Sequence, residues 1–300
     1  IIVIPGMLNG VPTEFVFDTG SPITITCGAN NRSAGIIPKK RVMVAADANG
    51  KAKLLPVVTI SAVQLGTQVF RNIRGITAEM PALACNQQVL LGQDIILQRN
   101  WLFDFENMKV IMSRDSIATE PASTFWTVQL KSKKPYVPLA LTKDTTLDCL
   151  IDLGFSGVFD AGPLYPAARQ IIWQKQANSL VYQRITRSMA LHGYGPPVVE
   201  NFFVADTVLI HGTPFHGLLV ASDDRSSTKL GTAFFSGTCR QLVLHHNSSR
   251  YELRWKKQYA LTKTALDVSI GYDNGQLFVD EKNIGTNAAS IDLQMGEAIE

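Results

Sequence analysis

The stretch Glu14-Phe15-Val16-Phe17-Asp18-Thr19-Gly20-Ser21-Pro22 joins a run of apolar residues to a polar turn. Phe and Val favour a buried β-strand, whereas an ionised Asp among apolar neighbours is costly unless it has a partner. Gly20 allows a tight turn and a close approach of the backbone to another group. The stretch therefore predicts a buried strand that delivers Asp18 to a partner elsewhere in the chain.

Length and composition set the class of protein. The 300 residues are enough for two domains, and 46% hydrophobic with 18% charged residues is typical of a globular chain. The net charge of +3 is small and the Lys and Arg residues are scattered, which argues against a nucleic-acid surface. No apolar run approaches the ~20 residues of a membrane span. Because the sequence begins at Ile1 without Met, the lack of a leader says nothing about export.

Cysteine and histidine patterns give no reason to expect a metal or a cofactor. None of the four cysteines forms a Cys-x-x-Cys motif, and the five histidines show no metal-ligand spacing. Cys149 lies in an apolar run, which favours a free buried thiol, although a disulfide remains an alternative.

Short β-branched and aromatic runs fill the first 115 residues, with Pro, Gly, Asn and Asp between them. This spacing predicts an all-β barrel or sandwich, with a hairpin turn at 46–50. Residues 113–123 have the composition of a linker. The predicted strands are 1–4, 14–17, 23–26, 41–45, 54–60, 69–76, 89–91, 101–105 and 109–112.

After this linker the pattern starts again. With Asp152 placed under Asp18, an offset of 134 residues, the apolar run 15–17 falls over 149–151 without a gap. Leu90-Leu91-Gly92 corresponds to Lys229-Leu230-Gly231 at an offset of 139 residues. Two copies of a strand, an Asp-x-Gly turn and a later Leu-Gly predict a duplicated fold. The second copy also contains a helical pattern at 166–176.

An apolar strand ending in Asp-Thr-Gly-Ser and followed some seventy residues later by apolar-apolar-Gly resembles the retropepsin and pepsin superfamily of aspartic proteases. The resemblance covers residues 1–254 in two copies. It implies two retropepsin-like β-barrel lobes in one chain, with the N-terminal lobe at 1–118 and the C-terminal lobe at 119–258.

The resemblance also implies that Asp18 and Asp152 form the catalytic pair of an aspartic-type endopeptidase. Two carboxyl groups that are this close share a proton, and a water between them attacks the peptide bond. The expected partner is a polypeptide substrate, bound by a monomeric catalytic unit that needs no cofactor.

Supporting residues follow from the same resemblance. Thr19 and Gly20 match the family's turn, in which the Thr hydroxyl links the two loops, and Ser21 would hydrogen-bond an Asp carboxylate. In the second copy Gly154 is kept, but Leu153 stands where the family has Thr. Phe155 replaces the Ser, and the following Ser156 would take its role.

These departures leave two alternatives open. Asp152 stands in a more apolar turn than Asp18, so burial would raise its pKa and make it the protonated partner. Alternatively the second loop has drifted, and the chain is a catalytically inactive retropepsin-like module that only binds peptides.

Two hairpins match the flaps that close over substrate in this family. The first lies at 45–51 and includes Asp47, Asn49 and Gly50. The second lies at 192–196, where Gly193 and Gly195 flank Tyr194. An ordinary exposed loop is the alternative for the second hairpin.

The tail contains a predicted strand at 275–279 and a partial resemblance to a PDZ domain over 264–300, carried by Ile284-Gly285 and Gly296-Glu297. The partial PDZ-like segment is expected to span 259–300. The combination of a protease with a PDZ-like module implies an exported bacterial protein, in the periplasm or at the cell surface.

Overall fold

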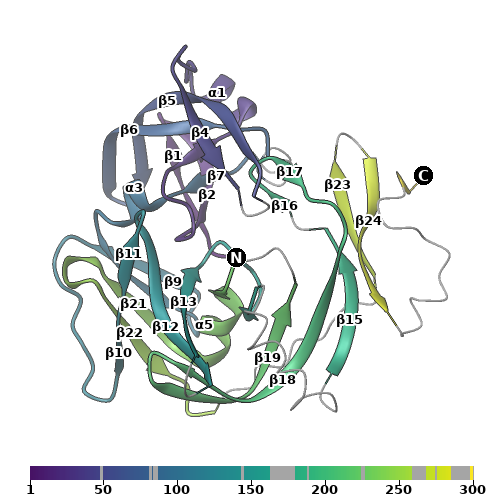
Figure 1. Ribbon diagram of the computed structural model, residues 1–300. Coiled ribbons are helices and arrows are strands. Elements are labelled where there is room, and N and C mark those ends of the chain that lie inside the picture. Colours follow the sequence, from purple (N-terminus) through teal and green to yellow (C-terminus); the bar gives the residue numbers. More distant parts are fainter. Residues whose placement is uncertain are drawn as a thin grey trace.

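The computed structural model describes residues 1–47, 50–80, 83, 87–142, 145–162, 180–187, 189–223, 227–258, 268–273, 276–284 and 298–299. The fold is all-β and consists of two closed six-stranded barrels, as the sequence predicts. Figure 1 shows the first barrel, in purple and blue, above the second barrel, in teal and green.

The first barrel is built from residues 3–77 and 89–91, and pairing between β1 and β5 closes it. Asn9 and Gly10 connect β1 to β2 with positive φ angles of 48° and 87°, the geometry of a two-residue hairpin turn. The six strands of the barrel, in sheet order, are β1 (Val3–Leu8), β2 (Val11–Phe17), β7 (Val89–Leu91), β3 (Ile25–Thr26), β6 (Gln68–Thr77) and β5 (Ala52–Leu65). A seventh strand, β4 (Val42–Ala46), pairs with the start of β5 outside the closed ring. The short helices α1 (Gly28–Ser33) and α3 (Gln93–Ile96) follow β3 and β7.

The second barrel repeats this order, and pairing between β12 and β18 closes it. Its six strands, in sheet order, are β12 (Lys134–Thr142), β13 (Thr145–Asp152), β20 (Lys229–Gly231), β14 (Phe159–Asp160), β19 (Thr213–Ser222) and β18 (Val198–Ile210). A seventh strand, β15 (Leu180–Thr186), pairs with the start of β18 outside the closed ring, as β4 does with β5. The strand β11 (Gln129–Lys131) extends the sheet beyond β12, and the helix α5 (Thr232–Thr238) follows β20.

Strand register confirms the duplication. In the first barrel β2 runs parallel to β7 with Phe17 opposite Leu91, and in the second β13 runs parallel to β20 with Ile151 opposite Leu230. These pairs are related by the two offsets of 134 and 139 residues that the sequence predicts. In both barrels the Asp-x-Gly turn therefore leaves the sheet at the same place.

A third, five-stranded sheet joins the barrels, in the order β10 (Thr124–Thr127), β22 (Arg250–Trp255), β21 (Cys239–His245), β8 (Asn100–Asp104) and β9 (Lys109–Ser113). The central pair is β8 and β21, in which Phe103 lies opposite Leu242. These are the equivalent strands of the two repeats. No strand or helix is assigned between β9 and β10, where the sequence predicts a linker.

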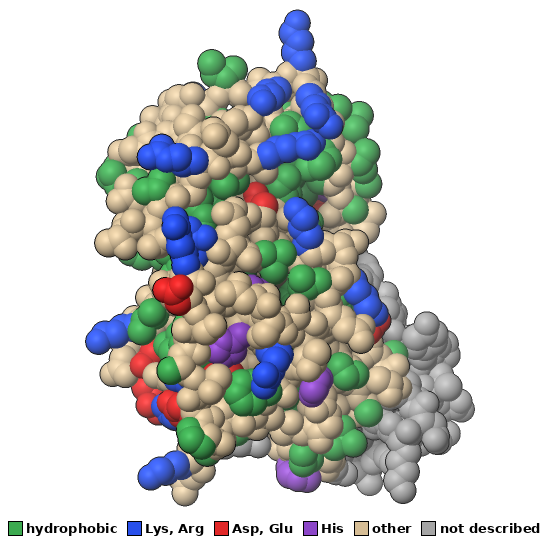
Figure 2. All heavy atoms as spheres, turned by 90° about the vertical axis from the view of Figure 1, so that its left-hand side faces the viewer, with side chains coloured by type: hydrophobic (Ala, Val, Ile, Leu, Met, Phe, Trp, Pro, Cys, Tyr) green, Lys and Arg blue, Asp and Glu red, His purple; other side chains and the backbone are tan. Residues whose placement is uncertain are grey.

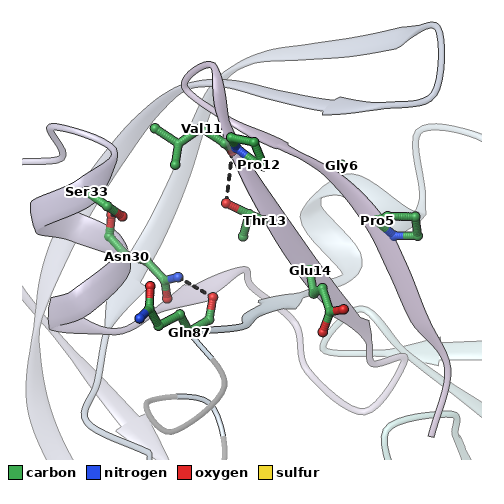
Figure 3. Close-up of a pocket in the computed structure, with 9 residues that line it drawn as sticks. All are labelled: Pro5, Gly6, Val11, Pro12, Thr13, Glu14, Asn30, Ser33 and Gln87. Carbon is green, nitrogen blue, oxygen red and sulfur yellow. Dashed lines mark hydrogen bonds between the residues drawn. The ribbon is translucent and has the colours of Figure 1, made fainter.

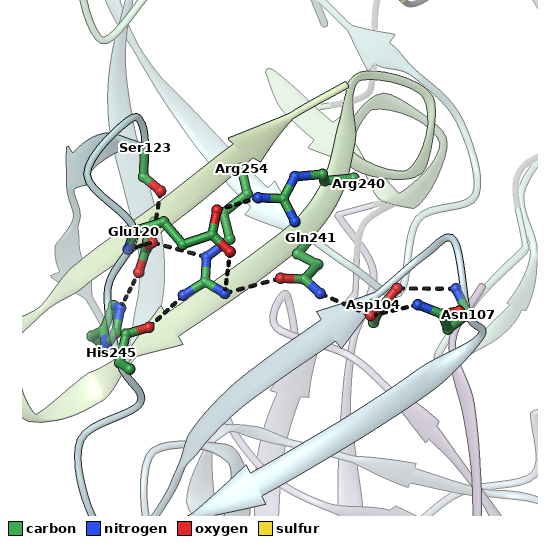
Figure 4. A network of polar contacts seen from close by, with 10 residues as sticks. Asp104, Asn107, Glu120, Ser123, Arg240, Gln241, His245 and Arg254 are labelled. Carbon is green, nitrogen blue, oxygen red and sulfur yellow. Dashed lines mark hydrogen bonds and ion pairs between the residues drawn. The ribbon is translucent and has the colours of Figure 1, made fainter. Parts of the chain in front are cut away.

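Polar side chains on the shared sheet and just before β10 form a connected network (Figure 4). The contacts of this network converge on Glu252, which is fully buried. Its carboxylate accepts hydrogen bonds from Arg254 at 2.9 Å, His245 at 2.9 Å and the Ser123 hydroxyl at 2.7 Å. Burial by itself would raise the pKa of Glu252, but these hydrogen bonds outweigh burial and lower the pKa to about 2. Glu252 is therefore ionised throughout the range in which proteins are usually handled.

One hydrophobic core runs through both barrels and the shared sheet, with Trp101, Trp126 and Phe234 among its largest buried side chains. Cys149 is a free, fully buried thiol, as predicted for its apolar strand. Among the described residues, no helix is long and apolar enough to cross a membrane.

The C-terminal residues extend the second barrel's sheet. β24 (Gln276–Ile284) pairs with the outer edge of β15, β23 (Val268–Asp273) forms a hairpin with β24, and β25 (Ala298–Ile299) pairs on its other side. The predicted strand at 275–279 is largely within β24. The helix predicted at 166–176 lies outside the described residues.

Candidate active site

The two Asp-x-Gly turns bring Asp18 and Asp152 together between the barrels. Their carboxyl groups lie within hydrogen-bond reach of each other. Each glycine lies against the opposite carboxyl group, since a Cβ on Gly20 would be 2.7 Å from Asp152 Cγ, and one on Gly154 would be 2.5 Å from Asp18 Cγ. Real Cβ atoms do not approach that closely, so both turns require glycine.

Asp18 is held by the backbone of its own turn. Its Oδ1 accepts hydrogen bonds from the N–H of Gly20 at 2.7 Å and of Ser21 at 3.1 Å. Burial, followed by the charge of Asp152 and the hydrogen bond to Asp152, raises the pKa of Asp18 well above its usual value despite these two donors. The pair therefore holds a proton to a higher pH than an isolated carboxyl group does. That Asp152 is the protonated partner stays a prediction.

Thr19 links the two turns. Its hydroxyl donates to the carbonyl of Ile151 at 2.6 Å and accepts from the N–H of Leu153 at 2.9 Å, and all three residues are fully buried. This is the linking position that the resemblance assigns to Thr19. Leu153, its counterpart in the second turn, has no hydroxyl and packs in the hydrophobic core instead.

Two further residues brace the turns, and the sequence analysis did not identify them. Gln93 donates from Nε2 to the carbonyl of Thr19 at 2.9 Å, and Thr232 donates from Oγ1 to the carbonyl of Leu153 at 2.6 Å. Each directly follows the Leu-Gly of its repeat, and each is buried. The sequence pattern that could have identified them is a polar residue directly after the Leu-Gly pair in both repeats.

The serines are placed differently from what the resemblance implies. The Ser21 hydroxyl donates to the carbonyl of Ile23 at 2.8 Å, so only the backbone of Ser21 contacts the Asp18 carboxylate. Ser156 is exposed, and within the part of the chain that the structure describes it forms no hydrogen bond to Asp152. Phe155, which stands in place of Ser21, lies beneath the Lys229 ammonium at 4.4 Å from the ring centre.

The two flap candidates contact each other across the barrels. The Asp47 carboxylate accepts from the N–H of His192 at 3.2 Å, and the His192 ring nitrogen Nε2 lies 2.8 Å from the Ala45 carbonyl. Lys51 donates to the Tyr194 carbonyl at 3.2 Å. His192, the first residue of the predicted second flap, makes two of these contacts.

Glycines and a cation shape the same two loops. Gly50 and Gly193 have positive φ angles of 73° and 93°, which the turns require. Arg187 lies over the ring of Tyr194 at 5.3 Å and donates to the Gly195 carbonyl at 3.3 Å. Asn49 lies outside the described residues.

An open hollow of about 440 Å³ lies elsewhere on the first barrel (Figure 3). It is lined by Pro12, Glu14 and Gln87, among others, and includes neither Asp18 nor Asp152. In the part of the chain that the structure describes, no group of three His, Cys, Asp or Glu side chains is placed to hold a metal ion.

Two barrels that each present one Asp-x-Gly turn to a shared centre fit a bilobal aspartic protease. Residues 4–95 match the family model for aspartyl proteases. This range covers β1 through α3 and includes Asp18, Thr19 and Gln93, but not the second turn. The match does not extend to the tail, so the PDZ-like resemblance stays a prediction. No curated protein gives a significant match to the chain.

Proposed function

We propose that this chain is an aspartic endopeptidase that hydrolyses peptide bonds with Asp18 and Asp152. The observation that carries the proposal is the close pair of carboxyl groups, one from each barrel and each against the glycine of the opposite turn, with a raised pKa on Asp18. A pair that holds one proton offers a general base and a general acid at the same place.

In the proposed reaction, the ionised carboxylate takes a proton from a water molecule as that water attacks the peptide carbonyl carbon. The protonated carboxyl group donates its proton to the carbonyl oxygen. Collapse of the tetrahedral intermediate, with protonation of the leaving amine, separates the two peptides. The reaction passes through no covalent enzyme intermediate, and it requires one carboxyl group of the pair to stay protonated.

The surroundings of the pair support an extended, partly apolar substrate. A second hydrophobic cluster in the first barrel includes Val16, Ile25 and Leu90. The side chains of the β4–β5 hairpin that pack against this cluster are Met43, Ala45 and Leu55. Leu191 of the second barrel packs against the same cluster. A peptide bound beside Asp18 under this hairpin would place apolar side chains on this cluster.

The test is cleavage of casein and of a peptide library between pH 3 and pH 8. We expect Asp18→Asn and Asp152→Asn each to lose roughly 10²- to 10⁴-fold in rate, since each removes the acid–base pair. Asp148→Asn is the matched control, because Asp148 lies on β13 near the turn but is exposed and paired with Lys131. The rate should fall as the pH rises through the pKa of the pair. Unchanged cleavage by both site variants would refute the proposal.

Leu153 and Phe155 favour a second candidate, a module that binds peptides without cleaving them. The second turn lacks the hydroxyl at 153, and a phenylalanine replaces the serine that follows the glycine. If the parent protein binds library peptides at every pH and cleaves none, this second candidate is the function.

A further inference from the structure

The two barrels differ on the faces that turn away from their cores next to the carboxyl pair. On β7, Leu91 points into the hydrophobic core and Leu90 points the other way, into the second hydrophobic cluster. On β20, Leu230 points into the core. Because side chains alternate along a strand, Lys229 takes the place in the second barrel that Leu90 has in the first.

Register places a second charged residue on this face. Ile25 pairs with Leu90 in the first barrel, and Asp160 pairs with Lys229 in the second. Where the first barrel has two aliphatic side chains, the second therefore has a cation and an anion. The other matched positions are apolar in both barrels, with Val16 and Ile76 in the first and Leu150 and Ala221 in the second.

This charged face lies next to Asp152. Gly231 is opposite Asp152 in the β13–β20 ladder, and Lys229 precedes Gly231 by two residues, on the same side of the strand. Two residues span about 7 Å of a strand, a distance that the side chain of a residue near the cleaved bond can cover. A peptide bound at both carboxyl groups would therefore meet an aliphatic face on one barrel and a charged face on the other.

The Lys229 side chain is largely buried. Figure 2 shows Lys and Arg side chains that stand out from the surface, whereas the side chain of Lys229 is only 13% exposed. Its Nζ lies 3.9 Å from the Asp160 carboxylate, beyond hydrogen-bond length, and 4.4 Å from the centre of the Phe155 ring. Within the described part of the chain, Nζ donates no hydrogen bond. An ammonium group has three donors, so it can bind a further acceptor here.

Asp160 lies deeper than Lys229 and has a closer partner. Its Oδ1 accepts a hydrogen bond from the N–H of Gly162 at 2.8 Å, and its side chain is 6% exposed. The carboxylate is thus both more buried and better satisfied than the ammonium group. A substrate side chain that reaches this pair would therefore contact the cation.

We propose that the second barrel selects a substrate residue with a carboxylate side chain, Glu or Asp, which binds the Lys229 ammonium group. The apolar cluster around Leu90 takes an apolar residue of the same peptide. The Phe155 ring holds the ammonium group in place, which gives a role to the residue that replaces the serine of the first turn. Selection of this kind rests on the proposed function, because it needs a peptide bound beside Asp152.

The test compares peptides that carry Glu, Gln or Lys at one position near the cleaved bond, each position in turn, at about pH 5, where a free Glu is mostly ionised. At one position we expect the parent to cleave the Glu peptide with a kcat/KM about tenfold above that of the Gln peptide, since only Glu pairs with the ammonium group as an ion. Lys229→Met should abolish that preference. Lys109→Met is the matched control, because Lys109 is an exposed lysine on β9.

A second variant keeps the test valid if Lys229→Met folds poorly. That substitution leaves the buried Asp160 without its cation, whereas Lys229→Leu combined with Asp160→Ile copies the matched pair Leu90 and Ile25 of the first barrel. The double variant should melt near the temperature of the parent and prefer an apolar residue to Glu at the selected position.

Binding of the same peptides, followed by fluorescence anisotropy, separates selection from catalysis. If the parent cleaves Glu and Gln peptides equally at every position, the selection is wrong and the protease proposal stands. If the parent binds Glu peptides more tightly, loses this preference in both Lys229 variants and cleaves none, only the protease proposal fails. A parent that neither binds nor cleaves overturns both. A preference for Lys, or a Glu preference that survives the double variant, assigns recognition to other groups and overturns the selection.

Discussion

Replacing Thr19 by Val tests the link between the two turns. The change keeps the branched shape but removes the hydroxyl that donates to the Ile151 carbonyl at 2.6 Å and accepts from the Leu153 N–H at 2.9 Å. Both partners belong to fully buried residues. Each buried group left without its partner costs about 1–3 kcal/mol, so the loss amounts to roughly 2–6 kcal/mol.

For a chain of 300 residues, that loss lowers the melting temperature by roughly 3–10 °C. Thr19→Ser is the control, because it keeps the hydroxyl and loses one methyl group at a cost of about 0.5–1.5 kcal/mol. Thermal unfolding followed by circular dichroism measures both variants. If Thr19→Val melts within about 1 °C of Thr19→Ser, the hydroxyl does not stabilise the contact between the barrels and the reasoning is wrong.

Three other predictions concern the site and the shared sheet. Gly154→Ala places a Cβ 2.5 Å from Asp18 Cγ and should reduce the cleavage rate at least 100-fold. Gly28→Ala is the control, because its Cβ meets only the movable ends of the Glu79 and Arg32 side chains, and it should leave the rate unchanged. Peptide cleavage kinetics compare the two variants, and equal rates would contradict the close packing at Gly154. The pKa of Glu252 is about 2 in the folded chain and 4.5 in the unfolded chain, so its ionised form adds roughly 3 kcal/mol to the free energy of unfolding above pH 4.5. This stabilisation is lost as the pH falls from 4.5 toward 2. Urea unfolding at several pH values should show this dependence for the parent and not for Glu252→Gln. Burial lowers the pKa of His246 from 6.5 to about 4, so between these pH values the unfolded chain binds a proton that the folded chain does not. The free energy of unfolding should therefore decrease as the pH falls from 6.5 to 4. His246→Gln should remove this decrease, and an unchanged decrease would assign it to another group.

Local patterns predicted the strands and the duplicated turns, because a buried strand, a glycine turn and a Leu-Gly pair each consist of residues that are adjacent in the sequence. β7 has the predicted bounds, and Phe17 and Ile151 occupy matching positions in their sheets. The partner of Asp18 was also predictable, because an apolar strand that ends in Asp occurs twice.

Contacts between distant residues were not predictable in the same way. The Ser21 hydroxyl turns to a carbonyl two residues away, since the backbone already supplies the donors to Asp18. Gln93 and Thr232 reach the turns only because β7 and β20 lie parallel to β2 and β13. The pairing of β24 with β15 joins segments about one hundred residues apart and has no local signal in either strand.

The one-sided link at Thr19 has a consequence for how such a site changes in evolution. In a protease assembled from two identical subunits, one gene encodes both turns, and a substitution at the threonine alters both at once. Here the two turns are separate stretches of one chain, so Thr19 carries the linking hydroxyl while Leu153, at the matching position, packs in the core. When one chain carries both turns, a substitution in one turn leaves the other unchanged. One turn can therefore keep the hydroxyl that links the barrels, while the other accepts a different side chain.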